Sequence, residues 1–438
     1  MGLGMKEVRA CEEEIKRSLE MRGMETERWE EAMEADRVLR EVQTQTQALR
    51  AQMREMQVEI AAAYKSGSPE RAQAVKEARE EMKGEVAVLE EEEERADDAR
   101  RRCLARLPNM LSPSVSEDLV VLDSITPSTP ESIPPTLGEG GERHDLYCAE
   151  ELLVKMGGAD FVRGSKVGGS RGFYLFGPGM ILNRALAEYG LDVLGLDGFT
   201  RVSPPLLMKQ DLMEKASELG PGLGGLYELP ECHRALIPSA EQPLAALHAN
   251  EILEQAVLPL RYAGFSQCFR PEAGERSARG LFRVHTFDKV EQFIVCVDGE
   301  DATCELDAAV GRTSAFYASL GLSHRVVRVP VSDLAFAAHV KHDVEALFVS
   351  DGTFRELASA SSTRTFQSRA LNVRVRSEDG ASKPEFVHMV NATLVATHRT
   401  LCAVLEAWQT PDGVVVPPVL RPYLPPSLRD TEVFPFMG

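Results

Sequence analysis

Charged residues that could bind a phosphorylated substrate gather in the stretch from Phe269 to Phe293, FRPEAGERSARGLFRVHTFDKVEQF. Its alternating apolar residues and glycine-flanked centre predict two strands joined by a loop. Because side chains an even number of residues apart share one face of a strand, we expect this hairpin to direct Arg270, Arg283 and Glu291 into one cleft. Two guanidinium groups beside a carboxylate suit a substrate with both phosphate and ammonium groups. Taken alone, the same pattern also fits a solvated charged surface.

A compact domain over residues 145–438 must position this hairpin. Helical periodicity covers residues 149–156 and 179–190, and strand-like runs cover residues 173–175, 199–202, 235–237, 284–297, 326–331, 344–349 and 371–375. Strands interleaved with separated helices predict an α+β fold with a mostly antiparallel sheet flanked by helices. The chain contains neither a GxxxxGK[ST] loop nor a GxGxxG turn after a strand, so phosphate binding must rely on arginines.

An N-terminal arm is predicted before this domain, over residues 1–108. Residues 6–107 have the periodicity of an antiparallel helical hairpin, with a turn at residues 65–69 where glycine and proline interrupt the pattern. Steps of three and four residues give the first helix a coiled-coil seam at Leu39, Val42, Thr46, Leu49, Met53, Met56 and Ile60. Periodicity alone does not separate a generic dimerisation coiled coil from an arm that reaches RNA.

Residues 109–144 are rich in Pro, Ser and Glu. This composition buries little apolar surface, so we expect an extended linker that lies on the domain or is partly mobile.

Composition limits the remaining function classes. The chain has 438 residues, 43% of them hydrophobic, and no apolar run long enough for a membrane span, so no membrane partner is expected. The N-terminal residues resemble neither a signal peptide nor an acid-poor transit peptide, and the eight cysteines form no CxxC pair. We therefore expect a cytoplasmic protein, with mitochondria as the alternative location. A net charge of −19 opposes indiscriminate coating of nucleic acid but permits a local basic groove.

Several stretches resemble the seryl-tRNA synthetase family of class II aminoacyl-tRNA synthetases, in the family's order. The hairpin resembles motif 2, and residues 169–175, 183–186 and 199–208 resemble the entry to motif 1 and its strand. IPSAEQPL at 237–244 resembles the loop that grips the amino group of serine, Arg355-Glu356 with Ser359 resembles the metal and phosphate stretch, and VNATLVATHRT at 390–400 resembles motif 3. The arm and the Leu107-Pro108-Asn109 junction match too. The residues of these stretches are more similar to those of the eukaryotic cytosolic enzymes than to those of the bacterial ones.

The resemblance implies a class II catalytic domain that activates serine with ATP and transfers it to tRNA(Ser), in a homodimer. Position by position, it implies that Arg270 holds the α-phosphate together with the serine carboxylate, and that Arg399 meets the γ-phosphate. Glu272 and Arg283 would contribute to the ATP site, and Phe287 would stack on adenine. No protein nucleophile is then needed, because the carboxylate of serine attacks and fixed positive groups stabilise the developing charge.

The resemblance also implies a magnesium site and a serine pocket. Glu356 and Ser359 would ligate Mg²⁺, which prefers oxygen ligands. The ammonium and hydroxyl groups of serine would be read by Ser239, Glu241, Glu291, Asn391 and Thr393. The alternative is that Glu241 and Glu291 pair with Arg270 and Arg283 in a purely structural network. His398 and the His339-x-x-His342 pair fit packing or surface roles better than metal ligation, because no third ligand stands at a suitable spacing.

Three features depart from the family's pattern. The motif 2 loop between Glu272 and Leu281 is two residues shorter than usual and lacks the Gly-x-Asp-Thr element that helps to place the tRNA end. Arg364 and Thr365 replace a neutral residue and an acid near the catalytic floor, and the arm carries the acidic run 90–94. These changes favour a second hypothesis, a paralogue that kept the fold but serves as a binding, assembly or regulatory protein. A third, transfer to a carrier protein, is less compatible with the arm, which such relatives typically lack.

Overall fold

The structure is a computed structural model that describes residues 2–127, 146–217, 225–272, 280–297, 299–377 and 383–437, without the side chains of residues 300 and 301. The chain divides into two compact units, Met1–Pro108 and Asn109–Gly438. Each unit has its own internal contacts.

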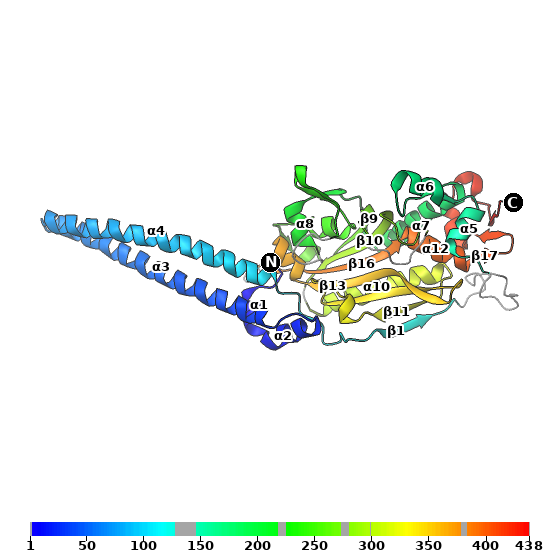
Figure 1. Cartoon of the computed structure of the whole chain (residues 1–438). Coiled ribbons are helices and arrows are strands. Elements are labelled where there is room, and N and C mark those ends of the chain that lie inside the picture. Colours follow the sequence, from blue (N-terminus) through cyan, green and yellow to red (C-terminus); the bar gives the residue numbers. More distant parts are fainter. Residues whose placement is uncertain are drawn as a thin grey trace. The chain divides into compact units, whose positions relative to one another are not determined.

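The N-terminal unit is a long helical hairpin preceded by two short helices. α3 (Glu27–Lys65) and α4 (Pro69–Ala105) lie side by side along their length (Figure 1), and α1 (Met5–Ala10) and α2 (Glu12–Met21) pack beside the start of α3. The hairpin predicted over residues 6–107 therefore begins only at Glu27. The predicted seam is confirmed, because all seven of its residues in α3 are buried or half-buried. The turn falls where glycine and proline predicted it, with Gly67 at a φ of 75°.

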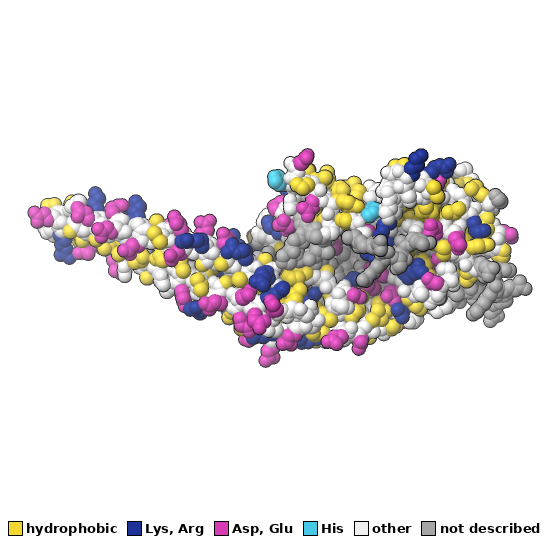
Figure 2. Space-filling model, in the orientation of Figure 1, with side chains coloured by type: hydrophobic (Ala, Val, Ile, Leu, Met, Phe, Trp, Pro, Cys, Tyr) yellow, Lys and Arg dark blue, Asp and Glu magenta, His cyan; other side chains and the backbone are white. Residues whose placement is uncertain are grey.

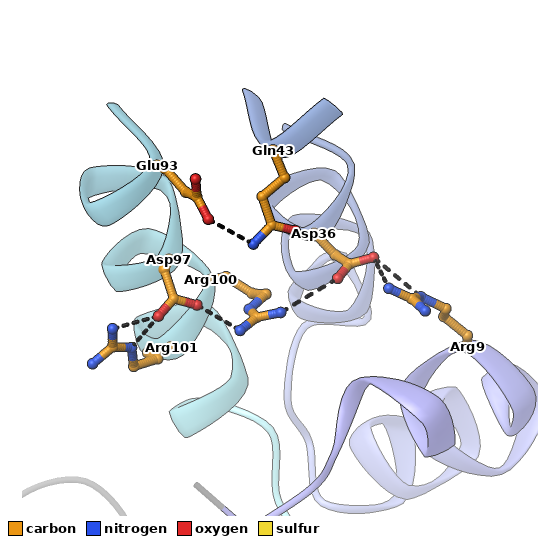
Figure 3. A network of polar contacts seen from close by, with 7 residues as sticks. All are labelled: Arg9, Asp36, Gln43, Glu93, Asp97, Arg100 and Arg101. Atoms are coloured by element: carbon orange, nitrogen blue, oxygen red, sulfur yellow. Dashed lines mark hydrogen bonds and ion pairs between the residues drawn. The ribbon is translucent and has the colours of Figure 1, made fainter. Parts of the chain in front are cut away.

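A buried carboxylate connects the parts of this unit. Asp36 of α3 is 2% exposed and pairs with Arg9 of α1 on one side and with Arg100 of α4, at 3.8 Å, on the other (Figure 3). Further along the hairpin, Gln43 Nε2 donates to Glu93 at 3.0 Å. We call the contacts of Asp36 with Arg9 and Arg100 the arm clasp. The clasp holds α1, α3 and α4 in one arrangement.

The body is built on an eight-stranded sheet in the order β1-β11-β12-β13-β16-β10-β9-β4. All neighbours are antiparallel except β4, which runs parallel to β9. The strands are β1 (Val120–Ile125), β4 (Thr200–Val202), β9 (Leu260–Phe269), β10 (Thr286–Cys296), β11 (His324–Arg328), β12 (Val340–Phe348), β13 (Thr353–Arg364) and β16 (His388–Ala396). The α+β class and the largely antiparallel sheet are confirmed.

Three helices cover one face of this sheet, which we call the rear face. They are α7 (Gly177–Leu196), α10 (Glu300–Ser319) and α12 (Thr397–Ala407). Gly190 of α7 shows why the packing is close: a Cβ added there would lie 2.9 Å from Val395 Cγ1 and 3.3 Å from Leu394 Cδ2. On the same face, Gln292 of β10 donates to Ala309 O of α10 at 3.2 Å. Side chains at positions 290 and 292 thus face the helices, and those at 289 and 291 face the other way.

Smaller elements surround the opposite face and the ends of the sheet. The helices are α5 (Ala149–Lys155), α6 (Phe161–Gly168), α8 (Gln210–Ala216), α9 (Glu241–Ala245) and α11 (Phe366–Leu371), and the strands are β2 (Ala159–Asp160), β3 (Tyr174–Leu175), β5 (Leu207–Lys209), β6 (Glu228–Leu229), β7 (Arg234–Leu236), β8 (Ile252–Glu254), β14 (Arg374–Arg376), β15 (Glu385–Phe386), β17 (Gln409–Thr410), β18 (Gly413–Val415) and β19 (Val433–Pro435). Residues of α8, α9 and α11 form a second apolar core with Phe293 and Val295. This core fixes α9 against the sheet.

The segment predicted as a linker contributes directly to the sheet. Residues 120–125 form β1, which pairs with β11, and the Asn109 side chain donates to Ala337 O at 2.8 Å and to Thr363 O at 2.9 Å. The body therefore includes residues well before 145. The rest of the predicted linker, residues 128–144, lies outside the described residues.

Two other boundaries differ from the sequence prediction. The run 371–375 is not one strand, because Leu371 ends α11 and β14 begins at Arg374. The second strand of the motif 2 hairpin begins at Thr286, so Phe282 and Val284 precede it in the connection. Among the described residues, no helix is long and apolar enough to cross a membrane.

Candidate active site

One face of the sheet, opposite the rear face, gathers the predicted site residues. In β10, Phe287, Lys289 and Glu291 share a face by alternation, and the register pairs Glu291 with Thr393 of β16. The register continues from Asn391 of β16 to Ser361 of β13, and from Ser359 to Asp343 of β12. A bulge at Leu357 brings Glu356 opposite Glu345, on the same face as Ser359. Residues that lie about a hundred positions apart thus share one surface, which we call the site face.

The motif 2 hairpin supplies charge at the edge of this face. β9 and β10 pair antiparallel, which confirms the hairpin, and Arg270 follows β9 directly. Its guanidinium lies 5.4 Å from the centre of the Phe287 ring, and its Nε donates to Pro238 O at 3.3 Å. Glu272 pairs with Arg283 and, at 3.7 Å, with Arg171. Residues 273–279, which include most of the shortened loop, lie outside the described residues.

Arg270 and Glu272 line two cavities. The first cavity, which we call the nucleotide cavity, is a small hollow of about 20 Å³ that is also lined by Phe282, Arg283, Val284, Phe287, His398 and Arg399. The second, which we call the amino-acid cavity, is about 320 Å³ in volume and is lined on its far side by Ser239, Glu241 and Gln242. Arg270 therefore stands between an aromatic and cationic cavity and a carboxylate-bearing one. Arg270 and Arg283 do share a cleft, as predicted, whereas Glu291 is not among the residues that line it.

Two amide side chains hold Glu241 in place. Glu241 is 6% exposed; one carboxylate oxygen accepts from Gln367 Nε2 at 2.9 Å and the other from Asn391 Nδ2 at 3.1 Å. The Ser239 hydroxyl accepts from the backbone N–H of Glu241 at 3.1 Å. Sequence reasoning singled out all of these residues except Gln367, which lies 126 positions from Glu241 and enters through α11.

Buried polar atoms without partners mark the floor of the site face. Glu291 is 0% exposed; its Oε1 pairs with Lys289, whereas its Oε2 has no partner within the described part of the chain. In that same part of the chain, Asn391 Oδ1 also lacks a hydrogen-bond donor. A buried polar atom without a partner is costly, so these atoms indicate a place where a polar ligand belongs. Lys289 was not predicted from the sequence, because it carries no motif signal of its own.

Glu356 lies among cations at the other end of the site face. Arg399 Nη1 is 3.3 Å from Glu356 Oε2 and also donates to Glu356 O at 3.3 Å. Burial alone would raise the pKa of Glu356, but the positive charges of Arg399, Lys341, Arg270 and Lys289 outweigh it and hold that pKa well below its usual range. Glu356 is therefore ionised at neutral pH.

The pKa of Asp343, on the same face, is changed in the opposite direction. Burial, followed by the negative charge of Glu356, raises the pKa of Asp343, although Lys341 lies 3.0 Å away. Two carboxylates with pKa values moved apart in one cleft are typical of functional sites.

The predicted histidines lie away from the site face or inside the core. His398 is 6% exposed and packs edge-on against Phe173 with ring centres 5.3 Å apart, and its burial lowers its pKa to about 4. His339 and His342 line a separate cavity toward the rear face, together with Arg364. Arg364 thus stands on the opposite side of the sheet from Glu356. Within the described ranges, no cluster of three His, Cys, Asp or Glu side chains is arranged to hold a metal ion.

A largely antiparallel sheet, a motif 2 arginine between two cavities and a motif 3 arginine that lines one of them define the catalytic core of a class II aminoacyl-tRNA synthetase. Residues 229–408 match the family model "tRNA synthetase class II core domain (G, H, P, S and T)", and residues 3–111 match "Seryl-tRNA synthetase N-terminal domain". The chain belongs to the seryl-tRNA synthetase family.

Individual relatives agree with this family. The chain is 35% identical over 416 residues to the serine–tRNA ligase of Helianthus annuus, which covers 94% of this chain and 93% of the relative. It is 42% identical over 280 residues to the cytoplasmic serine–tRNA ligase of Arabidopsis thaliana, of which the match spans 62%, and the match to the rat cytoplasmic enzyme spans 59% of that protein. The crystal structure of the Pyrococcus horikoshii seryl-tRNA synthetase complexed with ATP is similar over all of both chains, with a TM-score of 0.90 and 31% identity.

Proposed function

We propose that the protein is a serine–tRNA ligase that activates serine with ATP and transfers it to tRNA(Ser). The observation that carries this proposal is the position of Arg270 between the nucleotide cavity and the amino-acid cavity. One guanidinium at this junction can hold the α-phosphate and the serine carboxylate at once. Such orientation converts an encounter of two substrates into an in-line attack, which can lower the barrier by several kcal/mol.

The side chains around the nucleotide cavity have the chemistry to contact ATP. Phe287 offers a ring for adenine, and Arg283 and Arg399 offer positive charge for the phosphates. The carboxylate of serine attacks the α-phosphorus, the bond to the leaving diphosphate breaks, and the arginines stabilise the charge that builds on the oxygens. Similarity to a synthetase solved with ATP and, at 28% identity, to the Naegleria fowleri enzyme in complex with AMP supports this assignment.

The amino-acid cavity suits serine. The fixed carboxylate of Glu241 can accept the ammonium group, and Ser239 lies beside it. Glu291, Asn391 and Thr393 lie on the site face behind it, where unpartnered Glu291 and Asn391 oxygens can pair with the serine hydroxyl. A pocket built to bind a hydroxyl rejects alanine strongly, because the buried polar atoms are otherwise left unpaired.

Glu356 and Ser359 fit the magnesium ion that class II chemistry uses. They present one ionised carboxylate and one hydroxyl on the same face, and Mg²⁺ typically takes one or two carboxylates together with phosphate oxygens. The ion, when bound, neutralises phosphate charge. Arg399, which pairs with Glu356 and also lines the nucleotide cavity, helps to keep that carboxylate ionised.

The remaining assignments rest on the family and on the arm. The hairpin α3–α4 is proposed to contact tRNA, and the protein is proposed to act as a homodimer. The cytoplasm is the proposed location, as the names of several relatives suggest, with mitochondria as the alternative. Exposed apolar residues on α7, such as Met180 at 52% and Leu196 at 91%, are consistent with a subunit contact.

The second candidate is a paralogue without tRNA charging, favoured by the shortened motif 2 loop. Arg364 no longer counts toward it, because this residue lies on the other side of the sheet. The two candidates are separated by serine-dependent ATP–pyrophosphate exchange, run beside alanine and threonine, and by charging of tRNA with the same preparation. Exchange with charging supports the ligase. Exchange without charging supports the paralogue, and absence of exchange would overturn both the activation chemistry and the assignment of Arg270.

A further inference from the structure

A second polar cavity lies on the rear side of the sheet. It is about 410 Å³ in volume, within the range of small-molecule sites, and we call it the rear cavity. Its walls are the first turns of α10 and the ends of β11, β12, β13 and β16. Among the described side chains that line it, the charged and titratable ones are two arginines, three histidines and one carboxylate: Arg328, Arg364, His339, His342, His388 and Asp307.

Two of these side chains meet without an anion between them. Arg328 of β11 and His342 of β12 are direct cross-strand partners, so they extend from the same face at close range. Within the described part of the chain, Arg328 forms no ion pair and its buried Nε has no hydrogen-bond partner. Burial lowers the pKa of His342; the negative charge of Asp307 acts in the opposite direction, and the positive charge of Arg328 lowers the pKa by a smaller amount. A buried guanidinium nitrogen without an acceptor leaves room for an anionic ligand, and at Arg328 this nitrogen lies beside a cavity.

Asp307, the carboxylate among the described lining residues, does not serve as the anion that pairs with Arg328. Asp307 is exposed at the rim, and no ion pair joins it to Arg328 in the described ranges. His388 and His339 are already oriented by neighbours, since His388 Nε2 lies 2.7 Å from Ser362 Oγ and His339 Nδ1 lies 2.6 Å from Met110 O. Among its described side chains, the rear cavity therefore carries two arginines against one carboxylate, on a protein whose net charge is −19.

We propose that the rear cavity binds a small molecule that carries a phosphate group, with Arg328 and His342 as its principal contacts and Arg364 as a supporting charge. The guanidinium of Arg328 can donate two hydrogen bonds to phosphate oxygens, a geometry that arginine favours. The volume leaves room for an organic part beside the phosphate. This site is distinct from the candidate active site, because Ser362 faces it whereas Ser361, one residue earlier, belongs to the site face.

Calorimetric titration of the full chain with orthophosphate and with glycerol 2-phosphate tests the proposal. We expect both to bind, and the ester to bind more tightly if the organic part is used. Arg328→Gln should weaken binding at least tenfold, while Asp307→Asn should strengthen it several-fold by removing the competing carboxylate. Arg376→Gln, which removes an arginine that is 51% exposed and outside the cavity, should leave binding unchanged.

Serine-dependent ATP–pyrophosphate exchange provides the second measurement. Arg328→Gln should keep the exchange rate of the unmodified protein, which shows that the variant folds and that the lost phosphate site is not the ATP site. Binding by Arg328→Gln equal to that of the unmodified protein, or no binding of either ligand at about 10 mM, contradicts the proposal. These outcomes do not depend on whether the protein charges tRNA.

Discussion

At the scale of single residues, the site depends on side chains that orient others. Glu241 can receive an ammonium group only because Gln367 and Asn391 fix both of its oxygens. Arg399 orients the carboxylate of Glu356 in a similar way, by forming an ion pair with it. The residues that contact substrate therefore cannot be separated from the partners that hold them, a general property of preorganised sites.

Gln367→Leu should impair the binding of serine without changing that of ATP. The variant removes the donor to Glu241, and loss of a hydrogen bond to a charged group costs roughly 1.5–3 kcal/mol, or about ten- to a hundredfold. We expect KM for serine in the exchange reaction to rise by about that factor, with KM for ATP unchanged. Gln47→Leu, at an exposed position of α3, is the matched control. An equal rise in both KM values would show general disruption in place of a positioning role.

His398 should make the body less stable in mild acid. Its folded pKa of about 4 lies below the ordinary value of 6.5, because burial disfavours the charged imidazole. The unfolded chain therefore takes up the proton first, and the stabilising contribution is complete above pH 6.5 and declines as the pH falls toward 4. Between pH 7 and pH 5 this group should lower the free energy of unfolding by about 2 kcal/mol.

The measurement is guanidinium-induced unfolding of the body at both pH values, in the unmodified protein and in His398→Gln. The variant should lose about 2 kcal/mol less over this interval. Asp343, whose pKa is raised, changes stability in the opposite direction, so only the difference between the two proteins isolates His398. Identical pH dependence in both proteins would be incompatible with a buried neutral imidazole.

Sequence reasoning reached the site residues that stand in motifs and missed those that do not. The sequence motifs contain Arg270, Glu241 and Arg399, and the residue types of these motifs indicate what each side chain can bind. Gln367 and Lys289 matter because α11 and β10 bring them beside Glu241 and Glu291, and such partnerships across the fold leave no local pattern. The roles given to the motif residues remain predictions until substrates are tested.

At the scale of elements, close packing of α7 on the sheet supports the site face from behind. Gly190→Ala places a methyl group 2.9 Å from Val395 and should destabilise the body by about 1–3 kcal/mol, as overpacked cores do. Gly84→Ala is the contrasting control, since no atom lies within 4 Å of a Cβ at this position in the middle of α4. It should stabilise the arm by about 0.5–1 kcal/mol through helix propensity. Thermal unfolding of the two variants, followed by circular dichroism, should show shifts of opposite sign.

Helices and strands with a regular spacing of hydrophobic residues could be predicted from the sequence, whereas elements without such a spacing could not. The seam of α3 and the alternation in β10 were read correctly because one face of each element is buried. β1 was missed because it is an edge strand inside a segment rich in Pro and Ser, and its sheet pairing comes only from β11, some two hundred residues later. The start of the hairpin was placed too early because α1 and α2 have helical composition but fold back on α3.

At the scale of the whole molecule, charge is unevenly distributed along the chain. Residues 1–108 contain 20 Lys and Arg against 26 Asp and Glu. In the outer part of the hairpin, residues 46–88, seven basic residues balance seven acidic ones, whereas residues 27–45 and 89–105 together carry seven against thirteen. Figure 2 shows acidic and basic side chains interspersed along the hairpin. Ion pairs occupy basic residues in both parts, such as Arg101 of the inner part with Asp97 and Arg50 of the outer part with Glu90, so the two parts differ in their balance of charge.

RNA contact should therefore fall on the outer part of the arm. The double variant Arg54→Gln with Lys76→Gln should lower kcat/KM for tRNA charging by about tenfold and reduce the salt dependence of binding by about one to two ions. Arg37→Gln with Arg101→Gln removes the same charge from paired positions and should have a much smaller effect. Pyrophosphate exchange should be unchanged in both. Equal losses in the two double variants would assign the effect to net charge and exclude a local contact.

The arm clasp also determines how the arm can change in length. Asp36, Arg9 and Arg100 fix the alignment of α3 with α4 at one end, and the seam beyond them repeats every seven residues. Removing one heptad from each helix, residues 50–56 and 80–86, keeps the clasp, the seam and the turn, and shortens the hairpin by about 10 Å. Removing a heptad from one helix alone brings Glu93 or Leu107 toward Asp36 in place of Arg100, and buries a carboxylate with one partner fewer. Evolution or design can thus adjust the reach of the arm only in matched heptad steps.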